Sequence, residues 1–180
     1  IAFDRSATVL QGQLTGCEAM IIGAGDKATI TVNEKSSPQR QRFSIGHELG
    51  HWFKDRGKVG NLCSKHDMDS PSGAGKSREV IANEYASELL LPTYLLKPVL
   101  QDRPLDQSLL SEVVSAFDVS FMAALRRVIG SQHHMGFFAM YDSKGRRRLF
   151  KANESLPYEF LPPQLAPEHS RTYELIHNGK

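Results

Sequence analysis

The feature that most constrains this chain is a pair of histidines one helical turn apart. His47 and His51 lie in the stretch "RQRFSIGHELGHWFKDRG", and Glu48 directly follows the first of them. A spacing of four residues places both imidazoles on one face of an α-helix, where they can bind a single ion. The apolar residues of the stretch fall on the opposite side and predict a helix anchored in a core: Ile45, Leu49, Trp52 and Phe53.

The His-Glu-x-x-His arrangement is typical of zinc metalloproteases. Zinc lowers the pKa of a bound water to about 7, so that a carboxylate such as Glu48 can take its proton. Gly46 and Gly50 each weaken a helix by up to about 1 kcal/mol relative to alanine, which predicts that this helix needs close packing near the metal. The alternative is a solvated helix that carries two surface histidines.

The third metal ligand has to come from elsewhere in the chain. A catalytic zinc has three protein ligands and an open fourth position, and "WFKDRG" after His51 offers no histidine. A glutamate on a later helix is the other common solution, and Glu79 fits it, with a solvated surface carboxylate as the alternative. Asn83 lies four residues on and can hydrogen-bond a ligand histidine, whereas Glu84 and Glu88 lie on other faces of the same helix.

The segment before the histidine helix predicts a β-hairpin. Two apolar, partly β-branched runs flank "GAGD" in residues 18–34, and the second run, 28–32, alternates between two faces. Ser36 or Ser37 is the expected cap of the histidine helix, with a capping box between Ser36 and Gln39.

Helices and a second hairpin are expected in the rest of the chain. Gly57 ends the histidine helix, a loop covers 57–77, and a second helix runs from about Ser77 to Pro92. Residues 105–130 are expected to form two short helices, and residues 136–152 a hairpin with its turn at "DSKG". Residues 153–180 form a Pro-rich tail with a short element near "RTYELI". This order indicates an α+β fold.

Composition and charge exclude several classes of protein. Among 180 residues, 40% are hydrophobic and the net charge is +2, which is typical of a globular domain and does not predict nucleic-acid binding. Two cysteines, Cys17 and Cys63, are too few for a disulfide scaffold and indicate a reducing compartment. No apolar run approaches the roughly 18 residues of a membrane span and no signal peptide is visible, so we expect a cytoplasmic protein.

Two motifs resemble the ImmA/IrrE-type zinc metallopeptidases of bacteria and their mobile elements. The first is "RQRFSIGHELGHW". The second, "EVIANEYASELLLP", is similar to the E-x-x-A-N-x-F-A-x-E-L-L-x-P stretch of that family, with Tyr85 where phenylalanine is usual. The "VNE" before the histidine helix and the later "FDVSFMAALRRV" also fit, so the resemblance covers about residues 15–130.

This resemblance implies a site and a fold. The zinc ligands are then His47, His51 and Glu79, and the catalytic glutamate is Glu48. The implied fold is a minimal zincin with a small sheet, an active-site helix, a glutamate helix and a helix-turn-helix-like extension over 105–130, followed by a β-hairpin.

The resemblance also implies a domain organisation and a partner. We expect a zincin-like metallopeptidase domain over 1–130, with a small hairpin and tail over 131–180 packed on it. Members of the family typically cleave helix-turn-helix repressors, so we expect a zinc endopeptidase that cleaves such a repressor. An edge strand often pairs with an extended substrate in such folds, and 28–32 is the expected edge.

Two other functions are compatible with the sequence. A non-catalytic zincin-fold protein can sequester a repressor or an antitoxin, and a DNA-binding regulator can use 105–130. Arg126 and Arg127 are the only basic residues of that segment, so direct DNA binding is not expected. The sequence does not indicate an oligomeric state.

Several further side chains are candidates for a role near the metal. An oxyanion can be stabilised by a histidine or a tyrosine outside the ligand set, and the candidates are His133, His134, Tyr85 and Tyr94. Cys63 or His66 can swing onto the open zinc position as a switch, although an ordinary polar loop is the simpler interpretation.

Overall fold

The computed structural model describes residues 1–54, 61–64, 78–101, 103–131, 133–156 and 161–178, and for 61–64 it describes the backbone. The chain divides into two compact units, the first formed by Ile1–Leu96 with Ser115–Ser120 and the second by Lys97–Val114 with Phe121–Lys180. Helices and small sheets together make an α+β fold, as expected. These compact units are defined by contacts within the chain, and they change at residues 96, 114 and 120. The boundary expected at residue 130 concerns domains and stays a prediction.

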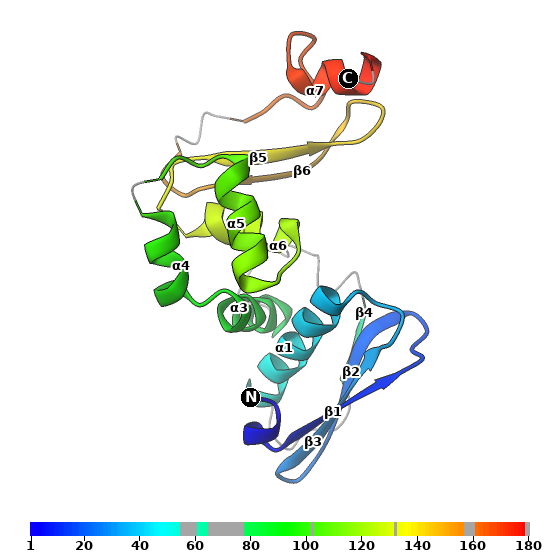
Figure 1. Ribbon diagram of the computed structural model, residues 1–180. Helices are drawn as coiled ribbons and strands as arrows, with labels where there is room; N and C mark the ends of the chain where they lie inside the picture. The colour runs from blue at the N-terminus through cyan, green and yellow to red at the C-terminus, as the bar shows by residue number, and fades with distance from the viewer. Residues whose placement is uncertain (55–60, 65–77, 102, 132, 157–160, 179–180) are drawn as a thin grey trace. The chain divides into compact units, whose positions relative to one another are not determined.

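The first unit contains a four-stranded sheet in the order β1-β3-β2-β4 (Figure 1). Strands β2 (Cys17–Ala24) and β3 (Lys27–Asn33) pair antiparallel, which confirms the hairpin expected over 18–34. Its turn includes Gly25, whose φ of 58° favours glycine. Strand β1 (Ala7–Gly12) follows a short 3-10 turn (Phe3–Arg5) and pairs parallel with β3.

The prediction that 28–32 forms an edge strand is wrong. These residues lie inside β3, which has β1 on one side and β2 on the other, so a substrate cannot add to it. The described edges of the sheet are β1 and β4 (Asn61–Ser64). Strand β4 also corrects the loop expected over 57–77, because it places Cys63 in a strand opposite Ala19; His66 and the rest of that loop lie outside the described residues.

Helix α1 (Pro38–Lys54) lies across one face of this sheet (Figure 1). Alternate residues of β3 are buried, and the same side of the sheet and α1 supply one apolar core that includes Ile21, Ile30, Val32, Leu49 and Trp52. A fully buried aliphatic side chain of this kind contributes about 1.5–3 kcal/mol. The indole Nε1 of Trp52 also donates to the carbonyl oxygen of Arg5 at 3.1 Å, which ties α1 to the segment before β1.

Ser37 caps the start of α1. Its hydroxyl accepts the backbone N–H of Arg40 at 3.3 Å, as expected for one of the two candidate serines. The capping box expected between Ser36 and Gln39 is wrong, because the N–H of Ser36 donates instead to the carbonyl oxygen of Asn33 at 3.1 Å. The expected end at Gly57 lies outside the described residues.

The first half of α1 is also bonded to the turn around Asp118. The guanidinium of Arg42 donates to Oδ2 of Asp118 at 2.8 Å and to its carbonyl oxygen at 2.6 Å. The amide of Gln39 donates to Oδ1 of the same side chain at 3.0 Å. Asp118 has a left-handed backbone, with φ of 48°, a conformation that aspartate tolerates better than most residues.

The second expected helix is α3 (Arg78–Leu90), and α4 (Thr93–Leu100) directly follows it. Helix α4 was not expected, because Pro92 and Pro98 flank or interrupt it. Pro92 stands just before the first turn, where its missing N–H costs nothing, and its carbonyl oxygen accepts the N–H of Leu96 at 2.9 Å.

The expected helices of 105–130 are α5 (Gln107–Phe117) and α6 (Phe121–Gly130), bent by 112°. Two helices at such an angle across a three-residue turn match the geometry of a helix-turn-helix. None of the helices in the described ranges is, by itself, both long and apolar enough to cross a membrane; α5 and α6 together pass that test of length and composition.

The second hairpin and the last helix are also confirmed. Strands β5 (Phe137–Tyr141) and β6 (Arg147–Ala152) pair antiparallel around the "DSKG" turn, where Gly145 has φ of 72°. Helix α7 (Arg171–Asn178) covers the short element expected near "RTYELI".

Replacing Gly23 with alanine tests the contact between the sheet and α1. A Cβ atom at Gly23 would lie 2.5 Å from Cζ3 of Trp52, so the indole would have to move. Overpacking of this kind costs about 1–3 kcal/mol. We expect urea unfolding to show a loss of that size in the Gly23→Ala variant, with altered fluorescence of Trp52, which is the one tryptophan of the chain.

Gly25→Asn is the matched control for this experiment. Gly25 has a left-handed backbone, and a Cβ atom added there would meet nothing within 4 Å; asparagine tolerates that backbone conformation. The stability of this variant should stay close to that of the wild type. Equal stability of Gly23→Ala and Gly25→Asn would contradict the close contact with Trp52.

Candidate metal centre

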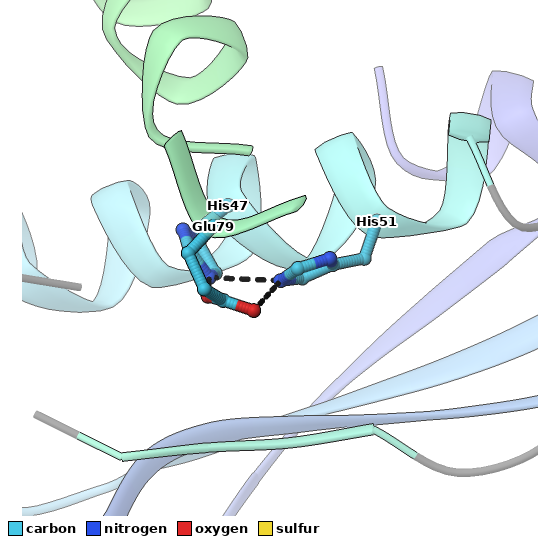
Figure 2. Close-up of side chains that lie close together, drawn as sticks. All are labelled: His47, His51 and Glu79. Atoms are coloured by element: carbon cyan, nitrogen blue, oxygen red, sulfur yellow. Dashed lines mark hydrogen bonds and ion pairs between the residues drawn. The ribbon is translucent and has the colours of Figure 1, made fainter. Parts of the chain in front are cut away.

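Three metal-ligating side chains from two helices meet in the first unit (Figure 2). His47 and His51 come from α1, and Glu79 comes from the first turn of α3. Their ligand atoms all lie within 4.8 Å of one another. The Nε2 atoms of the two histidines are 3.0 Å apart, and Glu79 lies 3.1 Å from His47 and 3.4 Å from His51.

The cluster is buried on the histidine side and open on the glutamate side. The side chains of His47 and His51 are 0% and 3% exposed, whereas that of Glu79 is 33% exposed. Glu48, next to His47 on the same helix, is fully buried. The histidines are therefore shielded from solvent, and Glu79 is the partly exposed member of the cluster.

Asn83 determines which nitrogen of His47 carries the proton. Nδ1 of His47 lies 2.9 Å from Oδ1 of Asn83, and an amide oxygen can only accept a hydrogen bond. Nδ1 therefore carries the hydrogen, and Nε2 of the neutral ring presents its lone pair to His51 and Glu79. This is the arrangement by which a neighbouring oxygen orients a metal-ligating histidine.

Burial favours this neutral form of His47. Desolvation lowers the pKa of His47 below its ordinary value, and the neighbouring imidazole of His51 lowers it further. The carboxylate of Glu79 and the hydrogen bond to Asn83 act in the opposite direction but are smaller effects. A neutral imidazole is the form that binds a metal.

The three side chains fit a metal ion by chemistry and by spacing. With Nδ1 of His47 protonated, its Nε2 and the carboxylate of Glu79 are both electron-pair donors, yet they lie 3.1 Å apart; a cation between them removes the repulsion. A tetrahedral zinc with bonds of about 2.0–2.1 Å holds neighbouring ligand atoms about 3.3 Å apart. The two Nε2 atoms are 3.0 Å apart, and Oε2 of Glu79 lies 3.1 Å from Nε2 of His47, both close to that value. The separation of 3.4 Å from Nε2 of His51 belongs to the other carboxylate oxygen, Oε1.

Small residues let the two helices come close enough to form the cluster. A Cβ atom on Gly50 would lie 2.8 Å from Cα of Ala82, and one on Gly46 would lie 3.2 Å from Cα of Ala86. The close packing expected from the two glycines is thus the contact between α1 and α3. Ala82 and Ala86 were not singled out from the sequence, although their spacing of four residues matches that of the glycines.

The other glutamates of α3 do not join the cluster. The carboxylate of Glu88 accepts from the N–H of Thr93 at 2.8 Å and from its hydroxyl at 2.9 Å, so it caps the start of α4. Glu84 is exposed. The structure thus places Glu79, of the three glutamates considered, beside the histidines.

The candidates for oxyanion stabilisation lie in varied surroundings. The ring of Tyr85 packs against Phe53 with centroids 5.2 Å apart, and Tyr94 is largely exposed. His133 and His134 belong to the second unit and bond to backbone carbonyl oxygens there. The role stays unassigned, and the switch considered for Cys63 and His66 falls on side chains outside the described residues.

A His-Glu-x-x-His helix with a glutamate from a second helix defines the class of metallopeptidase sites. Residues 17–128 match the family described as the IrrE N-terminal-like domain, Peptidase_M78. The match covers more than half of the chain, so the chain belongs to this family of metallopeptidases, which confirms the resemblance noted in the sequence. No curated protein gives a significant match to the chain.

Replacing Gly50 with alanine should push α1 and α3 apart. The new methyl group would lie 2.8 Å from the backbone of Ala82, which cannot move away as a flexible side chain can. We expect zinc affinity, measured by titration against a chromogenic chelator, to fall by about tenfold or more, since displaced ligands bind more weakly. Gly130→Ala is the control, because a Cβ there meets only the end of Lys151, at 3.5 Å; equal zinc affinity of both variants would contradict the role of the close approach.

Replacing Asn83 should weaken metal binding through His47. Asn83→Leu removes the acceptor for Nδ1–H of His47, and losing such a partner typically lowers metal affinity about 10–100-fold. Asn83→Asp keeps an oxygen at this position and should retain most of the affinity. Zinc titration of the two variants side by side checks this, and an equal loss in both would show that Asn83 matters for packing rather than for the proton on His47.

Proposed function

We propose that this chain is a zinc-dependent endopeptidase, in which His47, His51 and Glu79 bind the metal and Glu48 is the general base. The observation that carries the proposal is the meeting of three metal-ligating atoms from α1 and α3 in a chain that belongs to a metallopeptidase family. Two imidazoles and one carboxylate are a donor set that suits a catalytic zinc.

Glu48 is the residue of this chain that moves protons in the proposed reaction. Zinc, when bound, lowers the pKa of a water to about 7 and polarises the substrate carbonyl. Glu48 accepts the proton of the attacking water and then delivers it to the leaving amine nitrogen. Its burial beside His47 keeps the carboxylate away from bulk water, where a proton transfer of this kind would face competing acceptors.

Asn83 and the small residues of the helix contact support this chemistry without touching the substrate. Asn83 keeps the proton on Nδ1 of His47, so that Nε2 stays available. Gly50 and Ala82 bring α3 close enough for Glu79 to reach both histidines. Preorganised ligands of this kind need no rearrangement when the metal enters.

The proposed partner is a helix-turn-helix repressor, which the protein cleaves. The support is the resemblance of both motifs to ImmA/IrrE-type peptidases, together with family membership. Direct DNA binding is not part of the proposal: α5 and α6 have the angle of a helix-turn-helix, but Arg126 and Arg127 are the only basic residues in 105–130. The cytoplasmic location stays a prediction.

The Glu48→Gln variant separates a peptidase from a protein that only binds its partner. Loss of a general base lowers the rate about 10²–10⁴-fold, while the metal ligands stay in place. We expect Glu48→Gln to contain about one zinc per chain by mass spectrometry, by the single-site stoichiometry of such centres, and to leave a panel of helix-turn-helix repressors from the same genome intact. The wild type should cut one of them.

Two control variants complete this experiment. His51→Ala should lose both zinc and cleavage, and Glu84→Gln, on the exposed side of α3, should keep both. Cleavage by Glu48→Gln at the wild-type rate would remove Glu48 from the mechanism. Tight binding of a repressor by the wild type without cleavage would favour the non-catalytic, sequestering function instead.

A further inference from the structure

The second unit holds a short Pro-rich segment of its own tail along the β5–β6 hairpin. The segment, residues 161–166, reads "LPPQLA". It lies antiparallel to the chain just before and at the start of β6, where Leu165 forms a bridge with Arg146. We call residues 161–166 the strap.

The hairpin holds the strap through the backbone of the strap. The N–H of Arg147 donates to the carbonyl oxygen of Gln164 at 2.8 Å, and the N–H of Ala166 donates to the carbonyl oxygen of Gly145 at 2.8 Å. Two side chains of the hairpin also donate to the strap. The hydroxyl of Tyr141 donates to the carbonyl oxygen of Pro163 at 3.1 Å, and the guanidinium of Arg147 donates to the carbonyl oxygen of Pro162.

An aromatic ring lies beside one of these donors, and a second ring lies next to the first. The guanidinium of Arg147 lies over the ring of Phe150, 5.5 Å from the ring centroid, and the ring centroid of Phe137 lies 6.0 Å from that of Phe150. Aromatic side chains with hydrogen-bond donors aimed at proline carbonyls are how many domains recognise Pro-rich segments. The hairpin therefore has the chemistry of a binding site for a proline-containing extended peptide.

Only two side chains of the strap are buried. Pro162 and Ala166 are the two buried residues of 161–178, whereas Leu161 and Leu165 are about two-thirds exposed. Helix α7, which follows, buries no residue. Within 161–178, the described part of the tail, attachment therefore rests mainly on the burial of Pro162 and Ala166 and on a few hydrogen bonds. A second segment with the same backbone conformation can replace it.

We propose that the β5–β6 hairpin is a docking site for an extended, proline-containing segment of a partner protein, and that the strap occupies this site within the chain. The partner segment has proline at its first position and a small residue at its fifth, as in Pro162 and Ala166. The three positions between accept any side chain, because the hairpin contacts their backbone and leaves Pro163, Gln164 and Leu165 exposed. The strap competes with the partner at an effective concentration on the order of mM for a short linker.

A peptide that copies the strap tests this proposal on the whole 180-residue chain. The probe is a fluorescein-labelled peptide with the sequence of residues 161–167, "LPPQLAP", measured by fluorescence anisotropy. The Pro162→Glu, Ala166→Glu double variant puts charges at the two buried positions and releases the strap. Because removing the intramolecular competitor frees the site, we expect this variant to bind the peptide at least about tenfold more tightly than the wild type.

A matched pair of controls shows whether the binding uses the hairpin. Tyr141→Phe, added to the released variant, removes one hydroxyl and should weaken peptide binding about 2–10-fold, the effect of one hydrogen bond. A peptide with glutamate at the two buried positions should not bind. The proposal is overturned if the released variant binds no more tightly than the wild type, or if it binds the glutamate peptide equally well.

A measurement on the wild type keeps the test valid if the double variant does not fold. In a ¹⁵N-labelled wild-type chain with excess unlabelled peptide, displacement of the strap should speed the hydrogen exchange of the Ala166 amide. The Arg147 amide, which the peptide would cover in turn, should stay protected. An unchanged exchange rate at Ala166, at peptide concentrations above the mM-range effective concentration of the strap, would overturn the proposal.

Discussion

The close approach of α1 and α3 at Gly50 and Ala82 is the constraint on which the first unit depends. Packed helices usually lie about 8–10 Å apart, at a distance set by the side chains between them. Here the side chains in the contact are hydrogens and methyl groups, so the short carboxylate arm of Glu79 spans the gap to both histidines. Each of the two glycines lowers the stability of the helix by up to about 1 kcal/mol relative to alanine. A larger residue at either position would push α3 away from α1 and separate Glu79 from the histidines.

Helix α1 is held on its other side by the sheet, and this enclosure explains the electrostatics of the site. Leu49 and Trp52 are buried in the core that α1 shares with β2 and β3. The histidines lie between this core and α3, where burial lowers the pKa of His47. A neutral His47 imidazole beside the carboxylate of Glu79 leaves electron pairs that a cation satisfies well. The packing that buries His47 therefore also prepares the site for a metal.

Local patterns in the sequence are sufficient to predict several elements of both units. The histidine helix, the 18–34 hairpin and the 136–152 hairpin follow from periodicity and turn residues that act over a few positions. Glu79 was expected because the histidine motif lacks a third ligand, because it lies in the first turn of the next expected helix with Asn83 on the same face, and because the second motif resembles that of a known family. The helix and the two hairpins depend on neighbours in the sequence, whereas the meeting of Glu79 with the histidines joins residues 32 positions apart and is predicted from the motifs.

The missed elements depend on contacts that the sequence does not display. Strand β1 exposes four consecutive residues, so it has no alternating pattern, and its parallel pairing with β3 joins segments about 20 residues apart. That pairing is also why β3 was mistaken for an edge. Helix α4 was hidden because Pro92 and Pro98 indicate a break when they are considered without the fold.

The hydrogen bonds between Asp118 and α1 join a segment late in the chain to the first compact unit. Residues 115–120 belong to the first unit although the segments on both sides of them belong to the second. A chain shortened after Leu96 would keep the candidate metal-binding group of His47, His51 and Glu79 yet lose the partner of Gln39 and Arg42. The two units are therefore not modules fused end to end, and a recombination event between them would have to carry the Asp118 turn along with the metal centre.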